Sequence, residues 1–210
     1  MSTEVERRSK NPRGAGGRLR DEIVAAAREM LVEQGHETAI TLRGVARRIG
    51  IAAPSIYTHF STPEAIVQAV VVDTFAEMTA YIDTAKAGIE DPCERLLAGC
   101  RAYMTFGLEN PNLYGLLFTR NRQLGGRSPE GRAVTEDDLR GGSFGQLVQG
   151  VQDCIDAGVS SAPSAPGAAL ELWVAMHGLV SLRGAQYQMP WPPREAIEPS
   201  LVSALAHLRP

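Results

Sequence analysis

Residues 41–60 read TLRGVARRIGIAAPSIYTHF, and this stretch decides the fold. Its first part fits a short helix over about 41–50 that Thr41 can cap, because a threonine hydroxyl accepts from the exposed backbone N–H groups of a first helical turn. Pro54 can open a second short helix that ends near Phe60. Gly50 permits the turn between them, and Ala46 is small enough for the two helices to cross closely. This arrangement is typical of a helix-turn-helix.

The apolar residues of this stretch predict which face of each helix is buried. At about 100° per residue, Ile56 and Phe60 lie within about 40° of each other on the second helix. Its other residues, which point away, are Pro54, Ser55, Tyr57 and Thr58. In a helix-turn-helix the second helix enters the major groove of DNA, so this outward face is the candidate reading surface. An ordinary helical hairpin with a neutral surface is the alternative.

The charge around the motif is uneven. The whole chain carries a net charge of −3, but residues 1–60 hold ten basic against seven acidic residues, and residues 61–210 hold eleven against seventeen. Residues 38–63 contain no acidic residue and include Arg43, Arg47 and Arg48. Such a window can lie against phosphate without repulsion. A solvated basic face would show the same pattern.

Outside the motif, proline and glycine clusters separate apolar residues that recur at helical spacing. No alternation of period two indicates a strand, so we predict an all-α chain. We expect a flexible basic arm over 1–17, a three-helix DNA-binding domain over 18–62 and a helical domain over 63–210. The expected helices cover residues 18–34, 63–86, 92–108, 112–120, 136–157, 168–188 and 194–208.

Composition excludes several classes of protein. With 210 residues, of which 44% are hydrophobic and 21% charged, the chain falls in the globular range. It contains no run of eighteen apolar residues and no secretory signal pattern, so we expect a cytoplasmic protein with no membrane partner. The three cysteines, Cys93, Cys100 and Cys154, show no close ligand spacing, which predicts reduced thiols and no metal.

Sequence motifs of catalysis are missing as well. The four histidines have no partner four residues away and no HExxH-like motif, and the chain has no phosphate loop or dinucleotide-binding glycine pattern. We therefore expect no catalytic residue and no cofactor. A small helical enzyme is kept as a distant alternative.

The stretch and its surroundings resemble the DNA-binding segment of the TetR (tetracycline-repressor-like) family of bacterial regulators over residues 18–70. A second resemblance, in LWVAMHGLVSL, is to a subgroup with a C-terminal Trp and His-Gly signature, here Trp173, His177 and Gly178. The family implies an all-helical homodimer with a small-molecule effector and a palindromic operator. The residues that carry the first resemblance are Thr41, Arg43, Val45, Ala46, Gly50, Ile51, Ile56, Tyr57, His59, Phe60 and Glu64.

The resemblance implies phosphate contacts from Tyr57 and His59, with Thr41 contributing a further donor. A histidine that only supports Phe60 is the alternative for His59. Residues 53–59 contain no Arg or Lys, so any bidentate guanine contact would come from Arg43, or from an arm at Arg18 and Arg20. The expected DNA-binding set is Thr41, Arg43, Ala53, Pro54, Ser55, Tyr57, Thr58 and His59.

The sequence departs from the family pattern at two places. Ala52 stands where members often have a capping Ser, so the second helix depends on Pro54 for its start. Pro63 stands where members often have a phosphate-binding Lys, which leaves Ser61 and Thr62 as nearby donors.

Aromatic residues of the larger domain predict an effector pocket with few polar groups. A simple hydrophobic core is the alternative for each of them. Apolar residues at helical spacing on the last helix predict a dimerisation surface. The expected pocket residues are Tyr103, Phe106, Tyr114, Phe118, Trp173, Met176 and His177, and the expected dimer residues are Ile197, Leu201 and Leu205.

These observations together predict a sequence-specific regulator of transcription. Its expected partners are a double-stranded palindromic operator, a second copy of the chain and a small, largely apolar effector that releases the protein from DNA. A dimeric helix-turn-helix regulator controlled by a protein partner, with no small effector, is the alternative.

Overall fold

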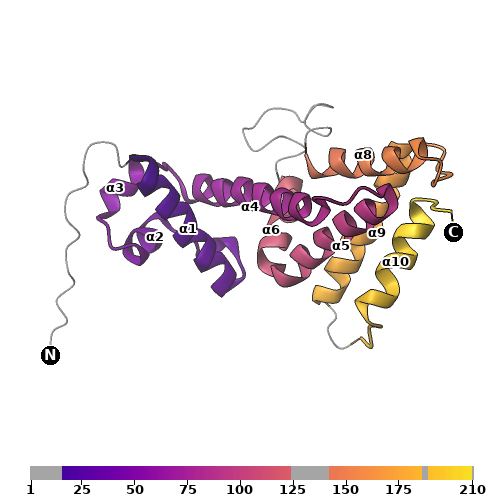
Figure 1. Cartoon of the computed structure of the whole chain (residues 1–210). Helices are drawn as coiled ribbons and strands as arrows, with labels where there is room; N and C mark the ends of the chain where they lie inside the picture. The colour runs from indigo at the N-terminus through magenta and orange to yellow at the C-terminus, as the bar shows by residue number, and fades with distance from the viewer. Residues whose placement is uncertain (1–15, 124–141, 186–188, 210) are drawn as a thin grey trace. The chain divides into compact units, whose positions relative to one another are not determined.

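The computed structural model describes residues 16–123, 142–185 and 189–209, and these form helices joined by short connections (Figure 1). In these ranges the only β-type pairing is an isolated antiparallel bridge between Ser160 and Leu208. The predicted all-α class is confirmed. The chain divides into two compact units, Met1–Thr74 and Phe75–Pro210. This division falls inside one helix, twelve residues beyond the domain boundary expected at 62/63, and the expected arm lies mostly outside the described residues.

The first unit is built from short helices around one small core. Helix α1 packs against α2, and α2 packs against α3. Val45, Ile56 and Ile66 are fully buried between them, which is where the helical spacing of the sequence places its apolar residues. The elements are α1 (Gly16–Gln34), the 3-10 turn η1 (Glu37–Ala39), α2 (Leu42–Arg48), α3 (Ala53–Tyr57) and the first half of α4 (Pro63–Lys86).

The second unit packs its remaining helices around α5 and α9. A Cβ atom placed on Gly107 of α5 would lie 2.7 Å from Val180 Cγ1 and 2.8 Å from Tyr114 Cδ2. Only glycine therefore lets α5, α6 and α9 approach so closely at this level. The elements are the second half of α4, α5 (Pro92–Glu109), α6 (Pro111–Gln123), α8 (Ser143–Asp156), α9 (Ala165–Ala185) and α10 (Arg194–Leu205).

Some helices end earlier than expected. Helix α3 stops at Tyr57, not near Phe60, and Thr58 Oγ1 donates to the carbonyl of Ser55 at 2.7 Å, as a terminating hydroxyl does. Helix α10 stops at Leu205, not at residue 208, because His207 takes a left-handed φ of 51° and the chain turns to pair with Ser160. Helix α8 begins at Ser143, and the expected residues 136–141 and 186–188 lie outside the described residues.

Two helices, α4 and α9, are long and apolar enough to cross a membrane by length and composition alone. Helix α9 packs against α5, α8 and α10, so its apolar character also serves the core of the second unit. Core helices commonly pass the same test, which makes it weak evidence.

Candidate functional site

The turn between α2 and α3 depends on one glycine. Gly50 has a φ of +70°, a left-handed conformation that side chains with a Cβ disfavour. The turn is closed by the N–H of Ile51, which donates to the carbonyl of Ala46 at 3.0 Å. The sequence thus fixes how α3 leaves α2, and with it the direction in which α3 presents its side chains.

Helix α2 places a hydroxyl and two arginines on the surface. Thr41 Oγ1 accepts from the N–H of Gly44 at 3.0 Å, so it caps the helix as expected while its own hydrogen stays available for donation. Arg43 and Arg47 are exposed. Arg48 instead binds carboxylates of α1, with Nη2 at 2.5 Å from Glu33 Oε1 and 3.2 Å from Glu29 Oε2. Of the arginines on α2, Arg43 and Arg47 are therefore the ones available for phosphate.

Helix α3 buries the face that the sequence predicts. Ile56 is 0% exposed and Phe60, just beyond the helix, is 4% exposed, whereas Tyr57 is 57% exposed. No side chain caps the helix at Ala52, as the sequence indicates. Pro54 and Thr58 are also exposed, whereas Ala53, Ser55 and His59 are half-buried.

The two arginines expected in an arm are helical. Arg18 and Arg20 lie in the first turns of α1, which begins at Gly16, so their assignment to an arm is wrong. The side chain of Arg20 has a local role, because its guanidinium carbon lies 5.3 Å from the centroid of the Phe60 ring. A guanidinium over an aromatic face is attracted to its π electrons, so Arg20 helps hold the end of the motif.

In the second unit, three helices bring polar groups together inside a cluster of aromatic rings. The hydroxyl of Tyr103 on α5 lies 2.7 Å from that of Tyr114 on α6, and the hydroxyl of Tyr114 lies 2.8 Å from Nδ1 of His177 on α9. The indole of Trp173 on α9 lies beside this group and lowers the pKa of Tyr103. Both tyrosines are buried, whereas Trp173 and His177 are half-buried.

Chemistry orders these hydrogen bonds. A tyrosine hydroxyl has one hydrogen, so the order that satisfies both hydroxyls has Tyr103 donating to Tyr114 and Tyr114 donating to Nδ1 of His177. Both hydroxyl hydrogens in this series of hydrogen bonds then have an acceptor. The hydrogen of a neutral His177 must be on Nε2, which has no acceptor among the described residues.

Burial keeps this cluster uncharged near neutral pH. It raises the pKa of Tyr103 to about 12, an effect that interactions with Tyr114 and Trp173 partly offset. It also raises the pKa of Tyr114, and it lowers the pKa of His177 below the ordinary histidine value. A proton on Nδ1 of His177 would moreover reverse the Tyr114 bond and leave the Tyr103 hydrogen without an acceptor.

The structure brings together five of the seven expected pocket residues and adds two that the sequence did not indicate. The ring of Phe118 lies 4.3 Å from that of His177, and Trp173 stacks on His177 at 5.8 Å, as centroid distances. Phe75 and Phe144 extend the cluster through Phe118 and Trp173 respectively. Phe106 is buried against Tyr81, and Met176 is buried with no aromatic contact described.

Comparisons with known proteins identify both units. Residues 23–70 match the model of bacterial regulatory proteins of the tetR family, and residues 96–208 match that of the tetracyclin repressor-like C-terminal domain. The chain belongs to the TetR family of bacterial transcriptional regulators. It is a DNA-binding regulator, and the helix-turn-helix predicted from residues 41–60 is confirmed.

Relatives of this TetR-family chain support the same conclusion. The HTH-type transcriptional regulator Rv0681 of Mycobacterium tuberculosis is 30% identical over 164 residues, which are 78% of this chain and 69% of that protein. A solved Rhodococcus sp. RHA1 protein of unknown function is 24% identical with a TM-score of 0.74, covering 94% of this chain and 95% of its own. A tetR-family regulatory protein from Rhodococcus RHA1 is 21% identical with a TM-score of 0.65, covering 89% and 94%.

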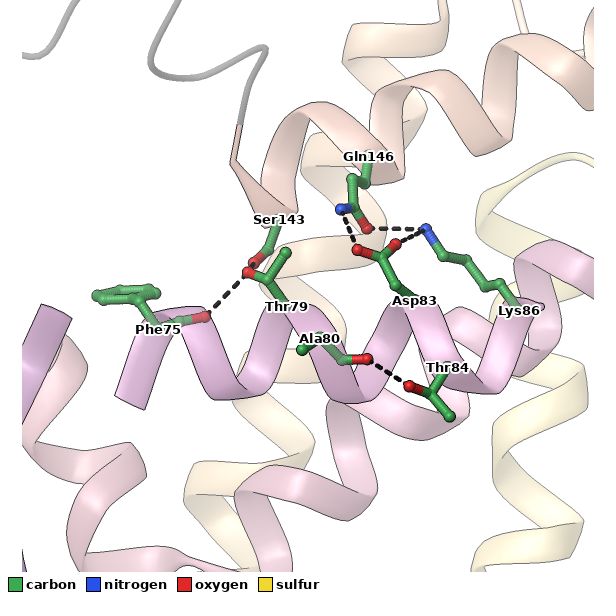
Figure 2. Close-up of polar contacts among 8 residues, drawn as sticks. All are labelled: Phe75, Thr79, Ala80, Asp83, Thr84, Lys86, Ser143 and Gln146. Atoms are coloured by element: carbon green, nitrogen blue, oxygen red, sulfur yellow. Dashed lines mark hydrogen bonds and ion pairs between the residues drawn. The ribbon is translucent and has the colours of Figure 1, made fainter. Parts of the chain in front are cut away.

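Polar contacts join α8 of this regulator to the second half of α4 (Figure 2). Thr79 donates to the carbonyl of Phe75, so the 2.8 Å contact between Thr79 and Ser143 is a bond that Ser143 donates. Lys86 donates to Gln146 Oε1 at 2.7 Å, and Gln146 Nε2 donates to Asp83 at 3.2 Å. Because Phe144 lies between these two contacts in the chain and touches Trp173, α8 links the aromatic cluster to α4.

The last two helices leave an apolar surface partly uncovered. Val202 of α10 and Ala206, directly after the helix, are fully buried. The expected residues Ile197, Leu201 and Leu205 are half-buried, so they are not the face that packs inside the chain. Helix α9 adds an exposed stripe with four-residue spacing that was not predicted from the sequence. It consists of Leu170, Val174 and Leu182, which are 50%, 58% and 51% exposed, with the half-buried Gly178 between the last two.

We predict that stability falls in acid through His177. Its pKa is lower in the folded than in the unfolded chain, where it is near 6.5, so the unfolded chain binds more protons as pH falls below 6.5. The free energy of unfolding should therefore decrease as pH falls from 6.5 towards the folded pKa and be level above pH 6.5, as far as this group contributes. In His177→Asn, whose amide oxygen can still accept from Tyr114, this decrease should be smaller.

Denaturant unfolding at a series of pH values measures this effect. His36→Asn, at an exposed histidine, is the matched control and should keep the pH dependence of the natural chain. An identical pH dependence for His177→Asn and the natural chain would contradict the assigned burial effect.

Proposed function

We propose that this regulator is a repressor that binds a palindromic double-stranded operator as a homodimer and is released by a small, largely apolar effector. The observation that carries the proposal is the aromatic cluster, in which a neutral His177 keeps one N–H donor beside half-buried rings. Pockets that orient apolar ligands commonly have this composition. The functional domain boundary at 62/63 and a cytoplasmic location are part of the proposal.

The structure supports distinct roles for the proposed DNA contacts. Tyr57, His59 and the Thr41 hydroxyl would donate to phosphate, and Arg43 would read guanine or contact phosphate. The hydrogen of Thr58 is already donated to Ser55, so Thr58 could only accept from a base edge or touch a methyl group. Ala53, Pro54 and Ser55 would lie against base edges. Arg18 and Arg20 would act from α1 and not from an arm.

Tyr57→Phe should weaken binding to operator and random duplex by the same factor. Loss of one phosphate hydrogen bond is worth about 1 kcal/mol, or about fivefold in affinity. Ser55→Ala should instead change the ranking of operator variants. Electrophoretic mobility shifts at fixed salt measure both effects.

The control for this experiment is Tyr81→Phe, the same change at an exposed tyrosine of the second unit, which should leave DNA affinity unchanged. A Tyr57→Phe protein with altered base preference and unchanged affinity for random duplex would reverse the assignment.

The proposed dimer uses α9 and α10 of each copy. The exposed stripe of α9 and the half-buried stripe of α10 lie on helices that pack against each other. A Cβ atom placed on Gly178, midway along the α9 stripe, would meet nothing within 4 Å in this chain, so this position is open to a partner helix. Four helices, two from each copy, would bury both stripes.

Val174→Glu should convert the dimer to a monomer in analytical ultracentrifugation at micromolar concentration. Val174 is 58% exposed, so the charge costs little in the single chain but would be buried without a partner at the interface. Val32→Glu, at a 50% exposed valine of α1, is the matched control and should stay dimeric. A natural chain that is monomeric, or a dimeric Val174→Glu protein, would contradict this interface.

The proposed effector would act through the second half of α4. Phe75 of α4 touches Phe118, and α8 is hydrogen-bonded to α4 on either side of Phe144. A ligand changes DNA binding only if it prefers one arrangement of the protein to another. Shifting a population from 99:1 to 1:99 takes about 10⁴-fold preference, about 5.5 kcal/mol, and weaker regulation takes less.

A screen of apolar compounds with one or two polar groups, read by thermal unfolding, tests this site. A binder should raise the melting temperature and weaken operator binding, and both effects should shrink in Trp173→Phe, which lacks the indole N–H. Glu171→Ala, at an exposed position of the same helix, should respond like the natural chain. A binder that acts equally on Trp173→Phe would place the site elsewhere. Binders that never alter operator affinity would favour control by a protein partner.

A further inference from the structure

Helices α5 and α8 meet along faces that carry all three cysteines. On α5, Cys93, Leu96 and Cys100 follow at spacings of three and four residues, so they share one face. On α8, Gly150 and Cys154 share a face by the same rule. A Cβ atom on Gly150 would lie 3.2 Å from Leu96 Cδ1, so this glycine allows the two helices to pack closely at this level.

An ion pair fixes the two helices in register beside the thiols. Arg95 Nη2 lies 3.0 Å from Asp153 Oδ2, and each residue is next to or near a cysteine in the chain. Arg95 Nη1 also donates to the carbonyls of Ile89 and Glu90, which anchors the start of α5. Because Arg95 contacts Asp153 and Leu96 lies at the level of Gly150, the two helices run in opposite directions, which places Cys93 opposite Cys154. Cys93 is also among the groups that raise the pKa of Cys154.

We propose that Cys93 and Cys154 form a reversible intramolecular disulfide when the protein meets hydrogen peroxide, which makes this pair a site of oxidative modification. In the first step, Cys93 sulfur takes an oxygen from peroxide, the O–O bond breaks, and the products are a sulfenic acid and water. In the second step, Cys154 sulfur attacks Cys93 sulfur, the S–S bond forms, the S–O bond breaks, and a second water leaves. Two thiols and one peroxide thus give one disulfide and two waters.

Exposure decides which thiol reacts first. Cys93 is partly exposed in the first turn of α5, whereas Cys100 and Cys154 are buried at 2% and 0% exposure. Burial also raises the pKa of Cys154 to about 12 and that of Cys100 to about 12, which suppresses their thiolates. Cys93 therefore meets peroxide first, and Cys154 remains reduced on the facing helix as its partner.

The geometry favours a disulfide over a shared metal. Among the described residues no group of three or more His, Cys, Asp or Glu side chains is arranged to hold a metal ion. Two cysteines that lie opposite each other across a pair of packed helices, with one of them accessible, are instead the arrangement of a redox-sensitive pair. Sequence spacing does not indicate this pair, because 61 positions separate the two cysteines in the chain.

The test uses the reduced full-length protein and hydrogen peroxide. We expect intact mass spectrometry to show the loss of two hydrogen atoms, and peptide mapping after alkylation under denaturing conditions to join the Cys93 and Cys154 peptides. Cys100 should be recovered alkylated, and a phosphine reductant should restore all three thiols. This result does not depend on the presence of an effector or an operator.

Variants assign the order of the steps. Cys93→Ser should leave Cys154 a thiol, whereas Cys154→Ala should accumulate a Cys93 sulfenic acid that dimedone traps. Cys100→Ser is the matched control and should still form the disulfide. The proposal is overturned if the natural chain oxidises Cys93 to the sulfinic acid with no Cys93–Cys154 linkage, or if its disulfide joins Cys100 to Cys154 or two copies of Cys93. Because mapping of the natural chain is decisive, a variant that unfolds leaves the test intact.

Discussion

Each buried tyrosine hydroxyl carries one hydrogen that needs an acceptor, and the polar interior of the second unit follows from this constraint. It directs the hydroxyls of Tyr103 and Tyr114 in sequence and ends on Nδ1 of His177. A buried chain of this kind is stable only if every member is satisfied, and a neutral His177 satisfies it. The remaining N–H of that ring, on Nε2, is then the one donor that the chain of hydrogen bonds leaves for a ligand.

Helix α9 connects this interior to the other functions of the protein. Trp173 and His177 belong to the aromatic cluster. The residues that directly follow them, Val174 and Gly178, belong to the stripe proposed for the dimer. On other sides of the cluster, Phe144 of α8 contacts Trp173, and Phe75 of α4 contacts Phe118. One helix thus supplies the proposed ligand wall and the proposed partner surface, so that occupancy of the cluster and geometry of the dimer would be coupled.

Local rules predicted the helix-turn-helix well, and contacts between distant segments escaped them. The cap at Thr41, the turn at Gly50 and the buried pair Ile56 and Phe60 depend on neighbours within a few residues, and the structure confirms them. The role of Phe144, the exposed stripe of α9 and the placement of Cys93 opposite Cys154 depend on which helices pack together. Helical spacing gives the faces of a helix but not its partners. For the same reason Arg48, on a basic face, was not assigned to the carboxylates of α1.

The nitrogen chemical shifts of the His177 ring test the central claim most directly, because they distinguish the two neutral tautomers and the imidazolium. Spectra of the ¹⁵N-histidine-labelled protein, with His177 assigned by its loss in His177→Asn, should show at neutral pH a neutral ring protonated on Nε2 with Nδ1 as acceptor. A His177 ring protonated on Nδ1 in the natural chain, as either the other tautomer or the imidazolium, would contradict the hydrogen-bond order on which the proposed effector site is built.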